Sequence, residues 1–201
     1  MAKNRIGTQI ETLIKRENWS AARSAIERFL EKETDDHWLW SRLSGVKYEQ
    51  RDYRGALEAA EKALEIVPDC PLALWSKATA QEMLGETAEA KKLYLQLIKR
   101  GLEEIQHPDT DAEECWEGSE WTFRLLADCV FRSAGCQAKM RMRERAIQMY
   151  QNFLNLQDLG IPSIYSCEQA MERLNKLVPS KKARRQAAMR RVVDTELISA
   201  P

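Results

Sequence analysis

Apolar residues recur three or four positions apart along most of this chain, a spacing that places them on one face of a helix. The stretches "NWSAARSAIERFL", "DYRGALEAAEKAL" and "ETAEAKKLYLQLI" align without a gap, and their alanines Ala22, Ala56 and Ala90 stand 34 residues apart. Four and seven positions after each alanine come further residues of the same face: Ile26 and Phe29, Ala60 and Ala63, and Tyr94 and Leu97. The pattern predicts three equivalent helices in an internal repeat.

Another helix is predicted before each of these three, because residues at helical spacing also precede the short polar turns "NW", "RDY" and "GET". The repeating unit is therefore a helix, a turn and a helix. Four units are expected, over about residues 3–36, 37–70, 71–101 and 120–155, and the first, which is sparse in apolar residues, should act as a cap. The turn of the fourth unit is expanded by "SAGCQAKMRMRE", so one or both of its helices should run on.

The second unit resembles the tetratricopeptide repeat, whose pattern is W-x2-L-G-x2-Y, then A-x3-F, then P. The residues that carry the resemblance are Trp40, Leu43, Ser44, Lys47, Ala56, Ala60, Ala63 and Pro68. Ser44 stands in place of the glycine, and Lys47 in place of the tyrosine. Over about residues 3–177, the resemblance implies an all-α fold, a right-handed superhelix (α-solenoid) of about four stacked helix pairs. Small residues let stacked helices approach closely, which accounts for the alanines.

Three segments complete the predicted organisation: an acidic insertion at residues 102–119, a capping helix at about 163–178 and a basic tail at 179–201. Ser166 and Gln169 have the spacing of a capping box at the start of the capping helix. Residues 1–178 are therefore expected to form the repeat domain, and the tail is expected to be flexible or ordered by a partner.

The resemblance also implies a binding surface, because in this family the first helices of the stacked units line a concave groove. The predicted partner-binding residues are Trp38, Ser41, Tyr48, Glu49, Leu72, Trp75, Thr79, Glu82, Met83, Trp121, Arg124, Asp128, Phe131 and Arg132. The three tryptophans among them are the strongest functional signal, since an exposed apolar strip usually marks an interaction surface. An alternative remains for Trp75 and Trp121, which could instead pack against a neighbouring repeat or the acidic insertion.

The expected partner is a protein that offers a peptide or an amphipathic helix. Chaperone-binding members of the family hold a terminal carboxylate with cations and amides, but the matching places here include Ser41, Gly45, Ser76 and Arg124, of which only Arg124 is a cation. An apolar helix or extended segment suits this groove better. The sequence therefore predicts a non-enzymatic interaction module, such as an adaptor, an assembly factor or a chaperone-like protein, and leaves self-association open.

The charges balance to a formal net charge of zero, but they are unevenly distributed. Residues 102–120 carry eight carboxylates and no Lys or Arg, so this segment is either a solvated connection or a surface for a basic partner. Trp116 within it is expected to fold back on the mouth of the groove. The tail carries six cations: Lys181, Lys182, Arg184, Arg185, Arg190 and Arg191.

These cations support an alternative function, in which the tail contacts the phosphates of a nucleic acid. The tail has no aromatic residue for base stacking, so pairing with acidic protein, including the chain's own acidic insertion, is favoured. The same cations are too local to give the whole protein a basic surface.

Catalytic and metal-binding signals are missing from the sequence. It has no Gly-rich phosphate loop, GxSxG or HExxH motif, and its five cysteines include no CxxC pair. His37 and His107 are the only histidines. No enzyme activity, metal or cofactor is therefore expected. Neither a secretion signal nor an apolar run of about 20 residues is present, which predicts a cytoplasmic protein with no membrane partner.

Overall fold

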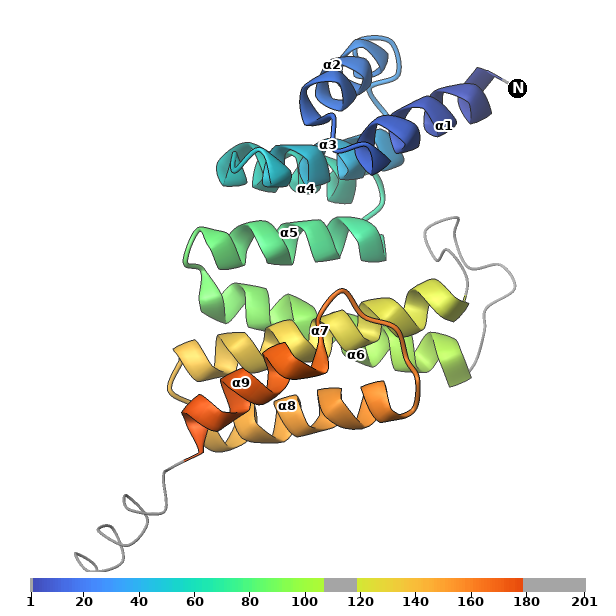
Figure 1. Ribbon diagram of the computed structural model, residues 1–201. Coiled ribbons are helices and arrows are strands. Elements are labelled where there is room, and N and C mark those ends of the chain that lie inside the picture. Colours follow the sequence, from blue (N-terminus) through green and yellow to red (C-terminus); the bar gives the residue numbers. More distant parts are fainter. Residues whose placement is uncertain (1, 107–118, 179–201) are drawn as a thin grey trace, which may run out of the picture.

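A computed structural model describes residues 2–106 and 119–178, which form nine α-helices and no strand (Figure 1). Their bounds are α1 Ala2–Lys15, α2 Trp19–Leu30, α3 His37–Glu49, α4 Tyr53–Ile66, α5 Pro71–Met83, α6 Thr87–Gln106, α7 Ser119–Lys139, α8 Arg143–Asp158 and α9 Cys167–Leu177. No helix within these residues is both long enough and apolar enough to cross a bilayer.

The helices stack in chain order, from α1 and α2 at the top of Figure 1 to α8 and α9 at the bottom. Each helix packs against the next one along the chain, and α3 also packs against α5. Because most contacts join neighbours, the architecture is an α-solenoid, as the spacing predicts.

Alanines mark the places where helices cross closely. Ala22, Ala56, Ala90 and Ala146 are each 0% exposed, one in the second helix of every unit. Ser44, which replaces the glycine of the repeat pattern, donates its hydroxyl proton to the carbonyl oxygen of Ala56 at 2.7 Å. The hydroxyl therefore joins α3 to α4 within one unit.

The turns inside the units share an unusual backbone conformation. Glu17, Arg51 and Gly85, which stand 34 residues apart, have φ angles of 55°, 62° and 87°, and Arg141 in the fourth unit has 60°. This left-handed region costs a residue with a side chain roughly 1–2 kcal/mol more than glycine. The repeat therefore dictates the turn geometry even where the sequence supplies no glycine.

Two helices extend beyond ordinary repeat length. α7 has 21 residues and runs to Lys139, which confirms that the expanded fourth turn lengthens a helix. α6 has 20 residues and continues to Gln106, so the first part of the predicted acidic insertion is helical. The rest of the insertion, with Trp116, lies outside the described residues, and so does the basic tail.

The predicted capping box is confirmed at the start of α9. The Ser166 hydroxyl accepts a hydrogen bond from the Gln169 amide, and the Gln169 side chain accepts one from the Ser166 amide. Helix α9 begins at Cys167, so residues 161–165 connect α8 to α9 without helical structure. We call residues 161–165 the strap, because they lie across α7.

Candidate functional site

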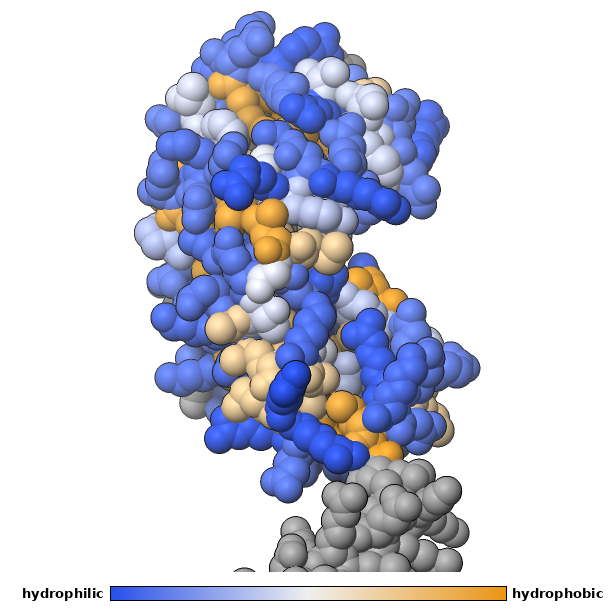
Figure 2. Space-filling model, turned by 90° about the vertical axis from the view of Figure 1, so that its left-hand side faces the viewer, coloured by the Kyte–Doolittle hydropathy of each residue, from blue (hydrophilic) through white to orange (hydrophobic). Residues whose placement is uncertain are grey.

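A cleft of about 260 Å³ opens on the concave side of the stack. Figure 2 shows the molecule hollowed between its upper, N-terminal part and its lower part. Residues of α3 and α5 line most of the cleft, Ile14 and Trp19 lie on the N-terminal side, and Arg132 and Ile164 lie on the C-terminal side. Seven of the fourteen predicted binding residues line it: Ser41, Tyr48, Glu49, Leu72, Trp75, Thr79 and Arg132.

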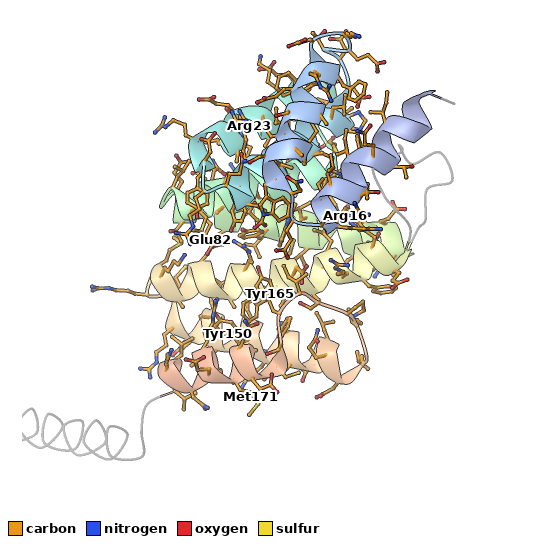
Figure 3. The ribbon with its side chains drawn as sticks, turned by 45° about the horizontal axis from the view of Figure 1, so that its top comes forward. Arg16, Arg23, Glu82, Tyr150, Tyr165 and Met171 are labelled. Atoms are coloured by element: carbon orange, nitrogen blue, oxygen red, sulfur yellow. The ribbon has the colours of Figure 1, made fainter. Side chains whose placement is uncertain are left out.

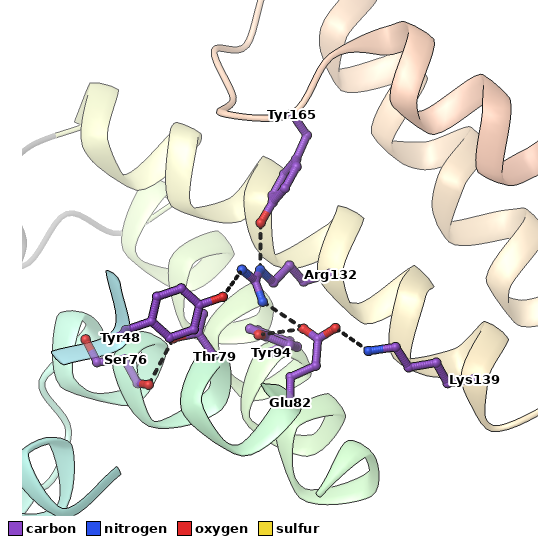
Figure 4. Close-up of polar contacts among 8 residues, drawn as sticks. All are labelled: Tyr48, Ser76, Thr79, Glu82, Tyr94, Arg132, Lys139 and Tyr165. Atoms are coloured by element: carbon purple, nitrogen blue, oxygen red, sulfur yellow. Dashed lines mark hydrogen bonds and ion pairs between the residues drawn. The ribbon is translucent and has the colours of Figure 1, made fainter. Parts of the chain in front are cut away.

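The side chain of Arg132 links three parts of the molecule at the cleft (Figure 4). Its Nη2 donates to the Tyr48 hydroxyl of α3 at 3.1 Å, and its Nη1 to Glu82 Oε2 of α5 at 2.9 Å. Its Nε donates to the hydroxyl of Tyr165, in the strap, at 2.6 Å. One arginine of α7 therefore ties the second, third and fourth units together.

Glu82 is the acidic centre of this network. It also accepts hydrogen bonds from the Tyr94 hydroxyl at 3.1 Å and from Lys139 Nζ at 2.8 Å. Burial alone would raise the pKa of Glu82, but Lys139 and Arg132 outweigh that effect and hold it below its ordinary value. The carboxylate is thus charged and fully engaged within the protein.

Trp75 combines the two roles that the sequence leaves open. It lines the cleft, and its ring also lies 5.6 Å from the ring of Tyr94, centroid to centroid. The guanidinium of Arg132 lies 5.7 Å from the Trp75 ring centroid, within cation–π range. Trp75 is therefore a half-buried residue with one side in the core and another facing the cleft.

Trp38 does not line the cleft, contrary to its predicted place in the groove. A Cβ atom added to Gly7 of α1 would lie 3.8 Å from Cη2 of Trp38, so the indole packs closely against that helix. Arg42 lies 5.2 Å from the Trp38 ring centroid and pairs with Glu11 of α1 at 2.7 Å. The first unit supplies few apolar residues, but its first helix still covers this tryptophan.

The strap covers the concave positions of the fourth unit. Asp128 accepts hydrogen bonds from the Ser163 hydroxyl at 2.5 Å and from the Ile164 amide at 3.1 Å. Burial raises the pKa of Asp128, and these two hydrogen bonds offset part of that effect. Asp128 is 5% exposed, so its predicted role in an open groove is wrong.

Phe131 is likewise a core residue rather than a groove residue, since it is 1% exposed. Its ring stacks on that of Tyr165 at a centroid distance of 4.0 Å, and it meets Tyr150 of α8 edge-on at 5.6 Å. Figure 3 shows Tyr165 and Tyr150 beside α7. The sequence could not have revealed this burial, because the strap has no helical or strand periodicity.

The remaining predicted residues lie outside the cleft. Trp121 is half-buried and packs against the core formed by α5, α6 and α7, the alternative that the sequence left open. Met83 is 45% exposed and Arg124 is exposed. Trp19 and Ile164 also line the cleft and were missed, because neither belongs to a first-helix groove position. Ile14 stands 34 residues before Tyr48, and it was missed because the groove positions were not carried into the first unit.

These observations define a helical repeat protein with a short cleft on its concave face. Residues 46–101 match the family model described as tetratricopeptide repeat. This span runs from the end of α3 through most of α6 and includes the buried alanines Ala56 and Ala90. The chain therefore contains a tetratricopeptide repeat segment at residues 46–101.

Comparison with curated protein sequences finds no match. Among solved structures, the crystal structure of MamA is similar, with 11% identity and a TM-score of 0.43, over 75% of this chain and 95% of that one. The tetratricopeptide repeat domain of P58(IPK) has 14% identity and a TM-score of 0.40, over 92% of this chain and 66% of that one. Both likenesses are too distant to bear on what this chain binds.

No group of three or more His, Cys, Asp or Glu side chains within residues 2–106 and 119–178 is placed to hold a metal ion. The charged groups of the Arg132 network are engaged with one another, as described above. Aromatic side chains and hydroxyl groups line the cleft.

Proposed function

We propose that this protein is a non-enzymatic protein-interaction module that binds a peptide or helix of another protein in the cleft. The observation that carries the proposal is the convergence of seven predicted binding residues, from three different repeat units, on one hollow surface. Tetratricopeptide repeats typically serve as interaction scaffolds, which agrees with this use. An adaptor, an assembly factor or a chaperone-like protein would each employ such a site.

The size of the cleft favours a partner side chain over a cofactor. Its volume of about 260 Å³ is below the roughly 300–1,000 Å³ of small-molecule sites. Trp19, Tyr48 and Trp75 line it. Aromatic residues of this kind dominate binding energy at protein interfaces, where cutting one to alanine commonly costs roughly 2 kcal/mol or more.

The way in which the strap packs on α7 favours a partner that binds through a short segment. It shows that non-helical chain can lie against a first helix of this protein through a main-chain amide, a hydroxyl and a stacked ring. It also forms the C-terminal limit of the cleft at Ile164, while Ile14 and Trp19 form the opposite limit. A partner is therefore expected to contribute a few residues, rather than a long helix along the whole stack.

The alternative in which the tail binds nucleic acid depends on residues outside the described part of the chain, so the structure adds nothing in its favour. The cytoplasmic location and the absence of a membrane partner likewise stay predictions from the sequence.

Gly45 offers a test that does not disturb the core. It lines the cleft, and a Cβ atom added there would meet nothing within 4 Å. The change Gly45→Gln would place a side chain in the cleft and also improve the helix, since glycine costs a helix interior roughly 0.5–1 kcal/mol relative to alanine. Peptides selected by the wild-type protein from a random display library should bind Gly45→Gln at least about tenfold more weakly.

The matched control is Gly45→Ala, which gives a similar gain in helix propensity but adds only a methyl group. It should retain peptide binding, and both variants should melt at or above the wild-type temperature by circular dichroism. Equal binding of the selected peptides by wild type and Gly45→Gln would contradict the proposal, as would the failure of the wild-type protein to enrich any peptide.

A further inference from the structure

The charged residues that line the cleft are Arg42, Arg132 and Glu49, and they differ in their pairing. Arg42 pairs with Glu11 at 2.7 Å, and Arg132 pairs with Glu82 at 2.9 Å. The Glu49 side chain is exposed and has no ion-pair or hydrogen-bond partner among the described residues. An uncompensated negative charge therefore lies at the edge of an otherwise neutralised cleft.

The position of Glu49 is also unfavourable for the fold. It is the last residue of α3, where the negative end of the helix dipole disfavours a carboxylate. The equivalent places in the other units hold Lys15, Met83 and Arg132. A residue that breaks a local rule without a compensating contact is expected where function requires it.

Three hydroxyl groups of the cleft lining donate their protons to main-chain carbonyls within the protein. Ser41 donates to the His37 carbonyl at 2.9 Å, Ser44 to the Ala56 carbonyl at 2.7 Å, and Thr79 to the Ser76 carbonyl at 3.0 Å. These residues are 2%, 1% and 6% exposed, so their hydroxyls are satisfied inside the protein and offer little to a ligand. The exposed Glu49 carboxylate is therefore the acceptor that the edge of the cleft offers to a partner.

We infer that the cleft selects a basic segment, in which an apolar side chain lies against Trp75 and a neighbouring Lys or Arg faces Glu49. The inference rests on the proposed function, since it specifies which segments the same cleft prefers. Lysine and arginine carry several N–H donors and no acceptor, and thereby match the free carboxylate. An acidic segment would meet Glu49 as a like charge.

The experiment compares three proteins: wild type, Glu49→Gln and Glu49→Lys. Each is used as the full chain to select peptides from the same random eight-residue display library, and the selected pools are sequenced. The wild type should enrich Lys and Arg beside an aliphatic or aromatic residue. Glu49→Gln should keep the apolar preference without the basic one, and Glu49→Lys should enrich Asp and Glu instead.

Affinities supply the second readout. The best wild-type peptide, labelled with a fluorophore, should bind Glu49→Gln about two- to fivefold more weakly, as expected for a solvent-exposed ion pair. Raising the salt concentration should reduce this difference by screening. The control Glu58→Gln removes an exposed carboxylate from α4, away from the cleft lining, and should bind like the wild type.

The two proposals fail in different ways. Enrichment of apolar peptides with no basic preference, or a basic preference that persists in Glu49→Gln, would overturn the inference about charge and leave the binding function intact. If the wild type enriches no peptide, the binding function itself is overturned and the charge inference with it.

Discussion

The concave face of this protein is open at the second and third units and closed at the fourth. The equivalent positions Gly45, Thr79 and Asp128 illustrate the difference. Gly45 leaves empty space, Thr79 bonds to its own helix, and Asp128 holds the strap through Ser163 and Ile164. The same position of the repeat is therefore open in one unit and covered by a segment of the chain in another.

The largest effect is expected from Phe131→Ala. The ring is buried between Tyr165 and Tyr150, so its removal should lower the free energy of unfolding by about 3–5 kcal/mol. Urea denaturation would measure this, with Phe131→Leu as a control that keeps more of the volume and should cost less. A loss below about 1 kcal/mol would mean that the fourth unit is open like the others.

A smaller effect is expected where the open and closed regions join, at the ion pair of Arg132 and Glu82. Arg132→Met should cost about 3 kcal/mol, because it leaves the largely buried Glu82 carboxylate with Lys139 as its remaining cation. Adding Glu82→Gln to Arg132→Met should recover part of the loss. A double variant less stable than the single one would show that the pair is not the source of the stabilisation.

The pH dependence of this pair follows from the lowered pKa of Glu82. Its contribution to stability is fully present above the pKa of the unfolded state and is lost as the pH falls through the lower pKa of the folded state. Urea midpoints measured from pH 7 to pH 3 should therefore decline more steeply for the wild type than for Glu82→Gln. Parallel curves would assign the acid sensitivity to other carboxylates.

The smallest of the three effects concerns the strap alone. Asp128→Ala leaves the Ser163 hydroxyl and the Ile164 amide without their acceptor and should cost about 1–3 kcal/mol. Hydrogen exchange at the Ile164 amide should become faster, whereas Asp128→Asn, which keeps an acceptor oxygen, should preserve most of the protection. Unchanged exchange in Asp128→Ala would show that Phe131 and Tyr165 hold the strap without the carboxylate.

The sequence predicted the features that repeat, because a repeated contact leaves a repeated residue. The buried alanines and the capping box of Ser166 and Gln169 belong to this class. It failed for Asp128 and Phe131, because the strap that covers them lacks the repeat pattern, and for Trp38, because α1 packs over it. A groove position is exposed only if no other part of the chain lies over it, and such coverage depends on tertiary structure.

The left-handed turns show a related limit. Only Gly85 is a residue that prefers this conformation, and Glu17, Arg51 and Arg141 adopt it in the turns of the other units. Local preference would have predicted one such turn, whereas the stacking of the helices imposes all four.

The alanine crossings have a mechanical consequence for the cleft. The distance between packed helices depends on the side chains at their contact, and most contacts in this stack join neighbouring helices. A larger side chain at Ala56 or Ala90 would therefore change the angle between the helices that meet there, and all helices beyond that contact would be displaced. Trp19 precedes both alanines in the stack and Ile164 follows them. The width of the cleft between Trp19 and Ile164 therefore depends on buried alanines that do not line it.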